Sequence, residues 1–269
     1  MDVPPERFAH VFLTRFNVRV VFGDDSEIND DEWLRSRLAL FLALTVPSVA
    51  AQTRPSPWIV FFDSESPSWF RDEIARHPVI TPVFVEGELT DSRIRGYVHD
   101  SGLNTREYLM TTRIDSDDAI RLDFTEQLAR LFRPAERTFI EFPRGLQIAD
   151  GRVYRRLWRS NPFLTLIEPG AGRIPTTVFC KSHNEVVGSE SVITSWRADM
   201  WAQSIHGANN SSVLSATSPK LTPGLPRTFR VDPALHLRPS YLPAIGDVYL
   251  RHIQKRLSRI RRSLPTLRR

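Results

Sequence analysis

The sequence predicts an α/β fold, a single domain with a mostly parallel central sheet flanked by helices and followed by a C-terminal extension. Strand-like and helix-like segments alternate up to Arg133, which is typical of parallel strands joined by crossover helices. The run Trp58–Phe62 (WIVFF) is apolar throughout, as expected of a central strand buried on both faces. Beyond Arg133 the pattern changes to short strand-like pieces separated by turns.

Apolar runs predict the strands of the alternating part, and caps and apolar faces predict its helices. The expected strands are His10–Asn17, Trp58–Phe62, Val79–Val85 and Tyr108–Ile114. The expected helices are Asp31–Ala51, Pro67–His77, Ser92–Ser101 and Ala119–Phe132. Asp30 or Asp31 caps the first helix, and Pro47 is expected to bend or end it. Pro67 suits the start of the second helix.

The remainder of the chain predicts smaller elements and then a segment without a long helix. The expected strands are Thr138–Phe142, Gly145–Ile148, Arg152–Tyr154 and Thr176–Phe179, and Trp196–His206 is expected to be helical. The stretch Gly207–Leu242 is rich in Ser and Pro, which favours a wrapping arm or a linker. We therefore divide the chain into a domain over 1–206, an arm over 207–246 and a terminal helix over 247–269.

The positive charge of the chain is concentrated in positions 247–269. The formal net charge is +5, but this segment holds eight basic residues and one acidic residue, which leaves 28 basic and 30 acidic residues before it. A nearly neutral body argues against nucleic acid as a partner. Apolar residues recur every three or four positions in the segment, so a basic amphipathic helix is expected. Such a helix suits an anionic membrane surface, the chain's own domain or a second copy of the chain in an oligomer.

Cysteine usage and hydropathy indicate the compartment. Cys180 is the only cysteine, so no intrachain disulfide can form and a reducing compartment is expected. Charged residues precede any apolar run at the N-terminus, unlike in a signal peptide. The longest apolar stretch, Leu38–Ala51, is shorter than the roughly 20 residues that span a bilayer. We expect a cytoplasmic protein, with peripheral contact to the inner face of a membrane through 247–269 as an open alternative.

Three carboxylates lie within the four positions of Asp115-Ser116-Asp117-Asp118, directly after the expected strand Tyr108–Ile114. Ligands of open α/β sheets bind beyond the carboxyl ends of the strands. Clustered carboxylates repel one another unless a cation or hydrogen-bond donors compensate, and Mg²⁺ or Mn²⁺ suits such hard oxygen ligands. The alternative is a helix N-terminus, where capping and the helix dipole favour Asp, although this explains one Asp better than three.

Spacing excludes several other kinds of site. A calcium loop that begins at Asp115 would need Gly at its sixth position, where Ile120 stands. The chain has no GxxxxGK[ST], no GxGxxG and no GxSxG, so a P-loop, a dinucleotide site and a serine-hydrolase elbow have no support. The single cysteine excludes a cysteine-based zinc site.

An ordered series of motifs resembles the putative rhamnosyltransferase family of bacterial glycosyltransferases. Its pieces include LTRFN (13–17), WLRSRLALF (33–41), WIVFFD (58–63), TTRIDSDDA (111–119), FPRG (142–145), SNPFLTLIE (160–168) and MWAQSIHGANNS (200–211). The resemblance implies a GT-A-like fold with a donor-binding half over 8–133 and an acceptor-side half over 134–206. It implies an inverting transfer of a sugar from a nucleotide diphosphate donor to a glycan or other hydroxyl acceptor, with Mn²⁺ or Mg²⁺. Rhamnose is suggested by the family name alone.

The resemblance also assigns roles to the carboxylate segment. Asp117 is the first choice as metal ligand and Asp118 the second, while Asp115 would contact the donor ribose or sugar. In similar metal-dependent transferases a C-terminal histidine completes the metal site, and carboxylate with imidazole suits Mn²⁺. His206 is the first candidate for this histidine and His183 the second, the alternative for His183 being a surface-loop histidine.

Further donor-binding residues are expected at the ends of strands. Arg15 and Arg113 end two strands and suit a diphosphate, or an ion pair with Asp63 or Asp118. Asp63 resembles the acidic residue that binds the base or ribose of the donor, or else it caps the following helix. Asn161 is expected in a loop near the acceptor.

The sequence leaves the catalytic base and the function class open. An inverting transferase needs a carboxylate that takes the acceptor proton. We choose Asp199 because it adjoins the motif at 200–211, while Glu168, Glu185 and Glu190 stay open. Two other functions use the same features. One is a non-catalytic protein that binds membrane or nucleic acid through its basic C-terminal helix, and the other is a metal-dependent nucleotide phosphohydrolase.

Overall fold

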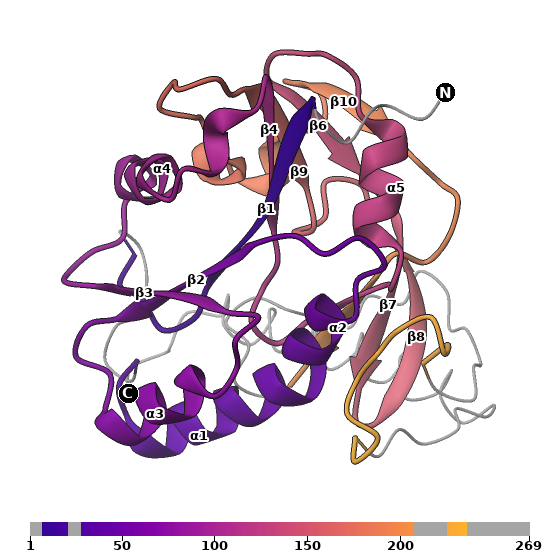
Figure 1. The fold of residues 1–269 in the computed structure, drawn as a ribbon. Coiled ribbons are helices and arrows are strands. Elements are labelled where there is room, and N and C mark those ends of the chain that lie inside the picture. Colours follow the sequence, from indigo (N-terminus) through magenta and orange to yellow (C-terminus); the bar gives the residue numbers. More distant parts are fainter. Residues whose placement is uncertain (1–6, 21–27, 207–224, 236–269) are drawn as a thin grey trace, which may run out of the picture.

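The computed structural model describes residues 7–20, 28–206 and 225–235, and its larger sheet confirms the predicted α/β fold. Seven strands follow the order β10-β6-β9-β4-β1-β2-β3 (Figure 1). They are β1 (Phe8–Arg15), β2 (Trp58–Asp63), β3 (Thr81–Val85), β4 (Tyr108–Arg113), β6 (Thr138–Glu141), β9 (Thr165–Pro169) and β10 (Ser191–Thr194). Only β9 runs antiparallel to its neighbours β4 and β6 in this sheet, so the sheet is mostly parallel, as predicted.

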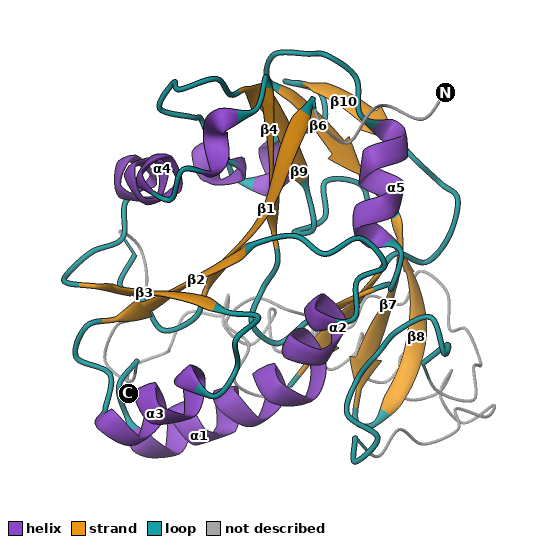
Figure 2. Ribbon diagram, viewed as in Figure 1, coloured by secondary structure: helices purple, strands orange, loops and turns teal. Residues whose placement is uncertain are grey.

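Helices cover both faces of this sheet (Figure 2). They are α1 (Asp31–Leu40), α2 (Val46–Ala50), α3 (Ser68–Ala75), α4 (Asp91–Asp100) and α5 (Phe124–Leu131). In β1, Phe8 and Phe12 pack with residues of α1, α3 and α5, whereas Val11 and Leu13 pack with residues of α4. Burial on both faces explains why the central strands are continuous apolar runs in the sequence.

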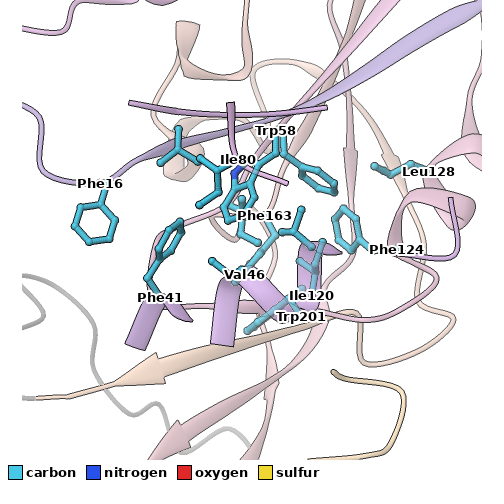
Figure 3. Packing of buried hydrophobic residues seen from close by; sticks show 14 of the residues in the cluster. Phe16, Phe41, Val46, Trp58, Ile80, Ile120, Phe124, Leu128, Phe163 and Trp201 are labelled. Atoms are coloured by element: carbon cyan, nitrogen blue, oxygen red, sulfur yellow. The ribbon is translucent and has the colours of Figure 1, made fainter. Parts of the chain in front are cut away.

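One hydrophobic cluster joins the larger sheet to the rest of the described chain (Figure 3). Trp58 of β2 packs on Phe41, with 5.3 Å between the ring centroids. On the other side of the cluster, Phe163 stacks on Trp201 with a centroid distance of 5.0 Å and an interplanar angle of 12°. Since Trp201 belongs to a second sheet, aromatic burial fixes the two sheets against each other.

This second sheet has four strands in the order β5-β11-β7-β8. Its strands are β5 (Ala119–Ile120), β7 (Arg144–Ala149), β8 (Arg152–Leu157) and β11 (Trp201–Ile205). β11 pairs antiparallel with β5, which places Trp201 opposite Ile120 and Ala202 opposite Ala119. Two distant parts of the chain therefore meet in one ladder, next to the carboxylate segment at 115–118.

The sequence prediction of two helices is wrong at the residues that form this ladder. Ala119–Phe132 is predicted as one helix, but it begins with β5, and α5 starts only at Phe124. Trp196–His206 is predicted as a helix, but its second part forms β11. The pairing of β5 with β11 buries the apolar side chains of both segments and satisfies their backbone groups, which outweighs the helical spacing.

The segment Thr176–Phe179 also differs from its prediction as a strand, because it leads into a 3₁₀ turn at Val178–Cys180. The adjacent strand β4 is already paired with β1 and β9 and offers no free edge. The Val178 N–H instead donates to the Thr111 hydroxyl group at 2.8 Å. Conversely, the sequence prediction omits β9 and β10, which the structure shows as strands.

The predicted helix Asp31–Ala51 is confirmed as a continuous helix over 31–50, but Pro47 does not end it. A π-helical turn, Phe41–Thr45, precedes the proline. Pro47 has no N–H to donate to the carbonyl group of Ala43. That carbonyl accepts the N–H of Asp232 at 2.8 Å instead, so a distant segment satisfies the group that the proline leaves unpaired.

This helix is long and apolar enough, by length and composition, to cross a membrane, with a mean hydropathy of 1.2. It begins at Asp30, whose side chain accepts the Trp33 N–H at 2.9 Å, as the capping prediction states. Leu34, Leu38 and the π-turn residue Phe41 are buried in the central cluster. In the described structure it is therefore a core helix.

The described part of the predicted arm, residues 225–235, lies over the smaller sheet. Phe229 is buried in a cluster with Leu146 of β7 and Val153 of β8. The Leu122 N–H donates to the Thr228 carbonyl group at 2.8 Å. This part wraps the domain, as one of the two predicted alternatives states. The predicted basic helix at 247–269 lies outside the described residues.

Candidate active site

Three predicted donor-binding residues lie at one edge of the larger sheet, because β1 lies between β2 and β4 and all three strands are parallel. The chain continues from β1 to β2 and β3 on one side and returns to β4 on the other side. The carboxyl ends of β1 and β4 are therefore a topological switch point, where open α/β sheets bind ligands. Arg15 ends β1, Arg113 ends β4 and Asp63 ends β2.

Arg113 and Asp115 form a two-pronged ion pair at the switch point. Arg113 Nε and Nη2 donate to the two carboxylate oxygens of Asp115 at 2.9 and 3.0 Å. Asp115 is therefore the ion-pair partner of Arg113, whereas the sequence alternative named Asp63 or Asp118. Burial raises the pKa of Asp115, but the attached Arg113 guanidinium outweighs burial and the net pKa lies below its usual value.

Arg15 lies beside this pair and stacks on an aromatic ring. Its guanidinium carbon is 4.6 Å from the ring centroid of Phe179. Burial and the charge of Arg113 lower the pKa of Arg15 to about 10, so the guanidinium keeps its charge at neutral pH. Within the described residues Arg15 makes no hydrogen bond or ion pair through its side chain. The nearby Asp115 carboxylate raises the pKa of Arg15 without a hydrogen bond to it, so the guanidinium N–H groups would be available to an anionic ligand at the switch point.

Asp117 meets His206 beside the ladder of β5 and β11. Asp117 Oδ2 lies 2.9 Å from His206 Nε2, although the two residues are 89 positions apart. Since β11 runs antiparallel to β5, residues that precede Ala119 lie beside residues that follow Ala202. The structure therefore brings together the two side chains that the sequence names as first choices for a metal site.

Asp118 bonds to the backbone of the same ladder. Its Oδ1 accepts the N–H of Ser204 in β11 at 2.9 Å, and its side chain is buried. Burial raises the pKa of Asp118 well above its usual value, and the charges of Asp117 and Asp115 act in the same direction. The whole carboxylate segment precedes β5 and not a helix, so the alternative of a helix N-terminus is wrong.

Arg37 of α1 belongs to this site, although the sequence prediction did not single it out. Its Nη1 donates to Asp117 Oδ2 at 3.2 Å and its Nη2 donates to Ser116 Oγ at 2.9 Å. The signal is its position in the helix, three residues after Leu34 and four before Phe41, which is the buried face. A cation on the apolar face of a helix needs a buried partner, and the carboxylate segment supplies it.

Asp63 lies in a separate polar cluster at the end of β2. Its Oδ1 accepts hydrogen bonds from Asn29 Nδ2 at 3.1 Å and from the Glu65 N–H at 2.7 Å. Arg19 Nε lies 3.3 Å from its Oδ2, and the side chain is buried. Asp63 thus bonds within the turn, while α3 begins at Ser68, directly after Pro67, without a side-chain cap, so the helix-cap alternative is wrong.

Asn161 is buried and holds the loop that precedes β9. Its Nδ2 donates to the carbonyl groups of Phe142 and Trp158, both at 2.9 Å. This loop lies next to the switch point, because the Arg113 N–H donates to the Leu164 carbonyl group at 3.2 Å. The Asn161 amide is therefore engaged by the loop itself.

His183 is bound to the same loop. Its Nδ1 lies 2.6 Å from the carbonyl oxygen of Ser160, and its ring packs edgewise against Trp158 with a centroid distance of 5.6 Å. His183 is half-buried, unlike the surface histidine of the sequence alternative. In the described structure Asp117 contacts His206, and no contact joins it to His183.

Asp199, the chosen catalytic base, lies at the opposite end of β11 from His206, since it precedes the strand and His206 follows it. Its carboxylate pairs with Arg144 at 3.3 Å and with Arg155 at 3.4 Å. The structure does not bring Asp199 to the Asp117–His206 pair.

The open carboxylate alternatives also lie elsewhere. Glu168 is paired with Leu109 near the start of β4, the end of the strand that is remote from the switch point. Glu190 directly precedes β10, at the starting end of the parallel pair of β6 and β10. Hydrogen bonds from Arg137 and Lys181 lower the pKa of Glu190 to about 2. Topology and pairing thus separate these carboxylates from the site.

The donor chemistry of Asp117 and His206 fits a divalent cation. One carboxylate oxygen and one imidazole nitrogen, held 2.9 Å apart, are ligands that Mn²⁺ accepts. Among the described residues no group of three or more His, Cys, Asp or Glu side chains is arranged to hold a metal ion. Mg²⁺ sites that include a nucleotide often use only one or two protein carboxylates, since phosphate oxygens and water supply the rest.

Comparison with known families shows to which family the chain belongs. The model of a family described as "Putative rhamnosyl transferase" matches residues 19–217, which is more than half of the chain. The chain belongs to this family. Membership confirms the resemblance inferred from the motifs.

Several solved structures are similar to this chain at low sequence identity. S. aureus TarS 1–349 is 10% identical, with a TM-score of 0.41, 74% of this chain covered and 60% of that chain. Its complex with UDP-GlcNAc is 12% identical, with a TM-score of 0.37 and coverages of 77% and 62%. A "putative nucleotide-diphospho-sugar transferase" from Desulfovibrio desulfuricans G20 is 7% identical, with a TM-score of 0.35 and coverages of 74% and 81%. The chain therefore spans about three fifths of the TarS 1–349 chain. No curated protein sequence matches it.

Proposed function

We propose that this member of the rhamnosyl transferase family transfers a sugar, rhamnose by its family, from a nucleoside diphosphate donor to a hydroxyl group of a glycan or similar acceptor. The transfer inverts the configuration at the sugar. The observation that carries the proposal is the 2.9 Å contact between Asp117 and His206. This pair lies only two residues from Asp115, which holds Arg113 at the switch point.

The charges of the site suit a metal diphosphate. Asp117 and His206 would hold Mn²⁺ or Mg²⁺, while Arg15 and Arg113 would face the diphosphate oxygens. The metal, when bound, supplies Lewis-acid stabilisation of the leaving diphosphate. Asp115 holds the Arg113 guanidinium in one orientation by two hydrogen bonds, so this cation is positioned before the donor arrives.

The residues of the chain stabilise the charge that develops on the leaving group. Departure of the nucleoside diphosphate places negative charge on its terminal phosphate oxygens. Arg15 keeps its charge at neutral pH and donates hydrogen bonds to these oxygens. Before the donor binds, Arg37 offsets the repulsion between Asp117 and the neighbouring carboxylates.

Other assignments extend the proposal. Asp63, at the end of β2, would bind the base or the ribose of the donor together with its polar neighbour Asn29. Asn161 acts on the acceptor side by shaping the loop before β9. A cytoplasmic location, with contact to a membrane through 247–269, would place the enzyme beside a lipid-linked acceptor.

Thermal melting with nucleoside diphosphates and nucleotide sugars, with and without MnCl₂, tests the proposed function. A bound donor raises the melting temperature by mass action, and we expect this rise to need the metal in the wild type. Asp117→Asn should abolish the metal-dependent rise. Asp123→Asn is the matched control, because Asp123 pairs with Arg121 at the start of α5, away from the site.

Two outcomes would contradict the proposed function. The first is a wild type that no nucleoside diphosphate stabilises in the presence of Mn²⁺. The second is release of inorganic phosphate from the nucleotide in place of sugar transfer to an added acceptor, which would indicate a phosphohydrolase.

A further inference from the structure

We propose that His183 is the catalytic base that takes the proton of the acceptor hydroxyl group. The proposal rests on the glycosyltransferase function above and concerns the step that needs a base. It assigns a residue to a role for which Asp199, Glu168 and Glu190 lie in the wrong places.

The topology places His183 at the edge of the switch point. β9 runs antiparallel to β4, so Thr165 at the start of β9 lies opposite Thr112 near the end of β4. The loop that precedes β9 therefore lies at the carboxyl end of β4. Ser160, in this loop, holds His183, while Arg113 bonds to the Leu164 carbonyl group at the other end of the loop.

The contact with Ser160 fixes the tautomer of His183. A carbonyl oxygen only accepts hydrogen bonds, so His183 Nδ1, 2.6 Å away, carries the proton and donates it. In the neutral ring Nε2 is then the basic nitrogen with its lone pair available. No side chain or backbone group of the described residues contacts this nitrogen. A neutral imidazole with an oriented, unbonded Nε2 is the arrangement that a general base requires.

The loop itself is held so that the carbonyl group of Ser160 points at the ring. Ser160 has a φ of +50°, which is uncommon for a residue with a side chain. Its N–H donates to the buried carboxylate of Glu141 at 2.8 Å, and its Oγ accepts the Val187 N–H at 3.0 Å. Trp158 packs against the imidazole from a further side. These contacts fix both the position and the rotation of the His183 ring.

The surroundings favour the neutral form of the ring. Burial lowers the pKa of His183, the Ser160 carbonyl group opposes this effect, and the nearby charges of Arg113 and Asp115 act in opposite directions. The net effect is a pKa below the usual value of a histidine. Arg113 and Asp115 lie at the end of β4, so their influence on the pKa indicates that His183 lies near the proposed donor site.

Three of the four predicted carboxylate bases do not share this position. Asp199 lies at the far end of β11 between two arginines, and Glu168 lies near the start of β4. Glu190 is paired with Arg137 and Lys181. Glu185 lies on the same turn as His183, but its side chain is exposed and no hydrogen bond among the described residues orients it. In the described structure the imidazole is therefore the oriented base of this turn near the carboxyl end of β4.

The transfer step is balanced with this base. The acceptor O–H bond breaks and its proton passes to His183 Nε2. The oxygen forms a bond to the anomeric carbon of the sugar from the face opposite the diphosphate. The bond between that carbon and the phosphate oxygen breaks, and its electron pair leaves with the nucleoside diphosphate. The imidazolium then returns its proton to solvent.

Replacement of His183 by Asn tests the role, because the Asn amide can still donate to the Ser160 carbonyl group but has no basic nitrogen. The assay measures nucleoside diphosphate release from dTDP-rhamnose, UDP-glucose, UDP-N-acetylglucosamine and GDP-mannose with MnCl₂, water being the acceptor. We expect His183→Asn to lower kcat by about 100-fold, within the range for general base catalysis, and to leave the affinity for the donor unchanged. The acidic limb of the wild-type pH profile should disappear in the variant.

His77→Asn is the control, because His77 follows α3 and contacts Glu73 away from the site. This variant should keep the wild-type kcat and pH profile. A His183→Asn enzyme that keeps kcat within threefold and retains the acidic limb would overturn the assignment while leaving the proposed function intact. A wild type that releases nothing from any donor would overturn the proposed function, and the role of His183 with it.

A measurement on the wild type keeps the test independent of the folding of any variant. NMR of protein labelled with ¹⁵N-histidine reports the tautomer of each ring. We expect one ring, protected by its carbonyl partner, to be neutral at pH 7 with the proton on Nδ1. If every histidine carries its proton on Nε2 or is doubly protonated at pH 7, His183 is not the base.

Discussion

The two sheets contribute to the candidate site in different ways. The larger sheet supplies Arg15 and Arg113 as the last residues of two paired parallel strands. The smaller sheet supplies the contact between Asp117 and His206, which exists only because β5 and β11 pair across a long sequence separation. The order of the parallel strands thus positions the two arginines, whereas the two-residue ladder of β5 and β11 positions the proposed metal-binding pair.

This difference predicts which half of the site is easier to lose. The strands of the larger sheet are buried on both faces and paired on both sides around β1 and β4. The ladder of β5 and β11 depends on the packing of Trp201 against Phe163. Damage to that packing should remove metal dependence first and leave the larger sheet folded.

Gly145→Ala should give the largest effect. A Cβ atom at Gly145 in β7 would overlap the ring of Trp201, which starts β11. The ring has no room to retreat, since it stacks on Phe163 at 5.0 Å and its Nε1 donates to the Phe142 carbonyl group at 2.7 Å. We expect a loss of about 3 kcal/mol in the free energy of unfolding, measured in urea, together with weaker Mn²⁺ dependence of donor binding.

Gly96→Ala is the matched control in the layer of the larger sheet. No atom lies within 4 Å of a Cβ at Gly96 of α4, so the substitution should stabilise by about 0.5–1 kcal/mol through helix propensity. If Gly145→Ala is as stable as the wild type, the stability of the β5–β11 ladder does not depend on the packing of Trp201.

Arg37→Met should have the second-largest effect. It removes the guanidinium from Asp117 Oδ2 and Ser116 Oγ, and the side chain of Arg37 is only 16% exposed. We expect a loss of about 2 kcal/mol without metal, less than for a fully buried pair because His206 still contacts Asp117. Added Mn²⁺ should restore more stability to the variant than to the wild type in thermal melting.

The control for this prediction is Arg35→Met on the same helix, where Arg35 and its partner Asp31 are 63% and 62% exposed. Exposed pairs contribute little, so its melting temperature should equal that of the wild type at every Mn²⁺ concentration. An equal fall in melting temperature in both variants would show that Arg37 stabilises helix α1 and not the carboxylate segment.

His10 tests the larger sheet alone and should give the smallest effect near neutral pH. Burial lowers the pKa of His10 to about 3, with a contribution from Arg54, while Nε2 bonds to Thr112 Oγ1 at 2.7 Å. Between about pH 6.5 and pH 3 the unfolded chain binds a proton at His10 that the folded chain does not. The free energy of unfolding should fall as the pH drops, by about 1.4 kcal/mol per pH unit at most, because one proton is bound on unfolding.

Urea unfolding at pH 7 and pH 5 measures this slope, and His10→Gln should flatten it. Mn²⁺-dependent donor binding at pH 7 should stay unchanged in the same variant, because His10 lies near the start of β1, opposite Met110 of β4, and not at the carboxyl ends of these strands. A variant with the wild-type slope would contradict the neutral state of the buried ring.

Five strands of the larger sheet, β1, β2, β3, β4 and β6, were predicted from the sequence, and the central ones carry their own signal. Runs such as Trp58–Phe62 are apolar on both faces and need no knowledge of their partners. The strands β5 and β11 carry no such signal, because Ala119 and Ala202 suit helices and only their pairing makes them strands. β10, at the edge of the larger sheet, was missed because its residues are mostly half-buried.

The candidate site divides in the same manner. Arg15, Arg113 and Asp115 follow from their positions at the ends of apolar strands. Arg37 was detectable as a cation on a buried helical face, although its partner was not. The position of Asp199 could not be predicted, because it depends on the direction of β11, which the sequence suggested to be a helix.

The central claim is that the smaller sheet makes Asp117 and His206 into one metal-binding pair. Electron paramagnetic resonance of free Mn²⁺ measures it directly, in the presence of the nucleoside diphosphate that stabilises the wild type most. Asp117→Asn and His206→Asn should each weaken Mn²⁺ binding by at least about tenfold. The double variant should bind Mn²⁺ about as tightly as the single variant with the lower affinity, because the two side chains act as one site. Wild-type Mn²⁺ affinity in His206→Asn would contradict the account.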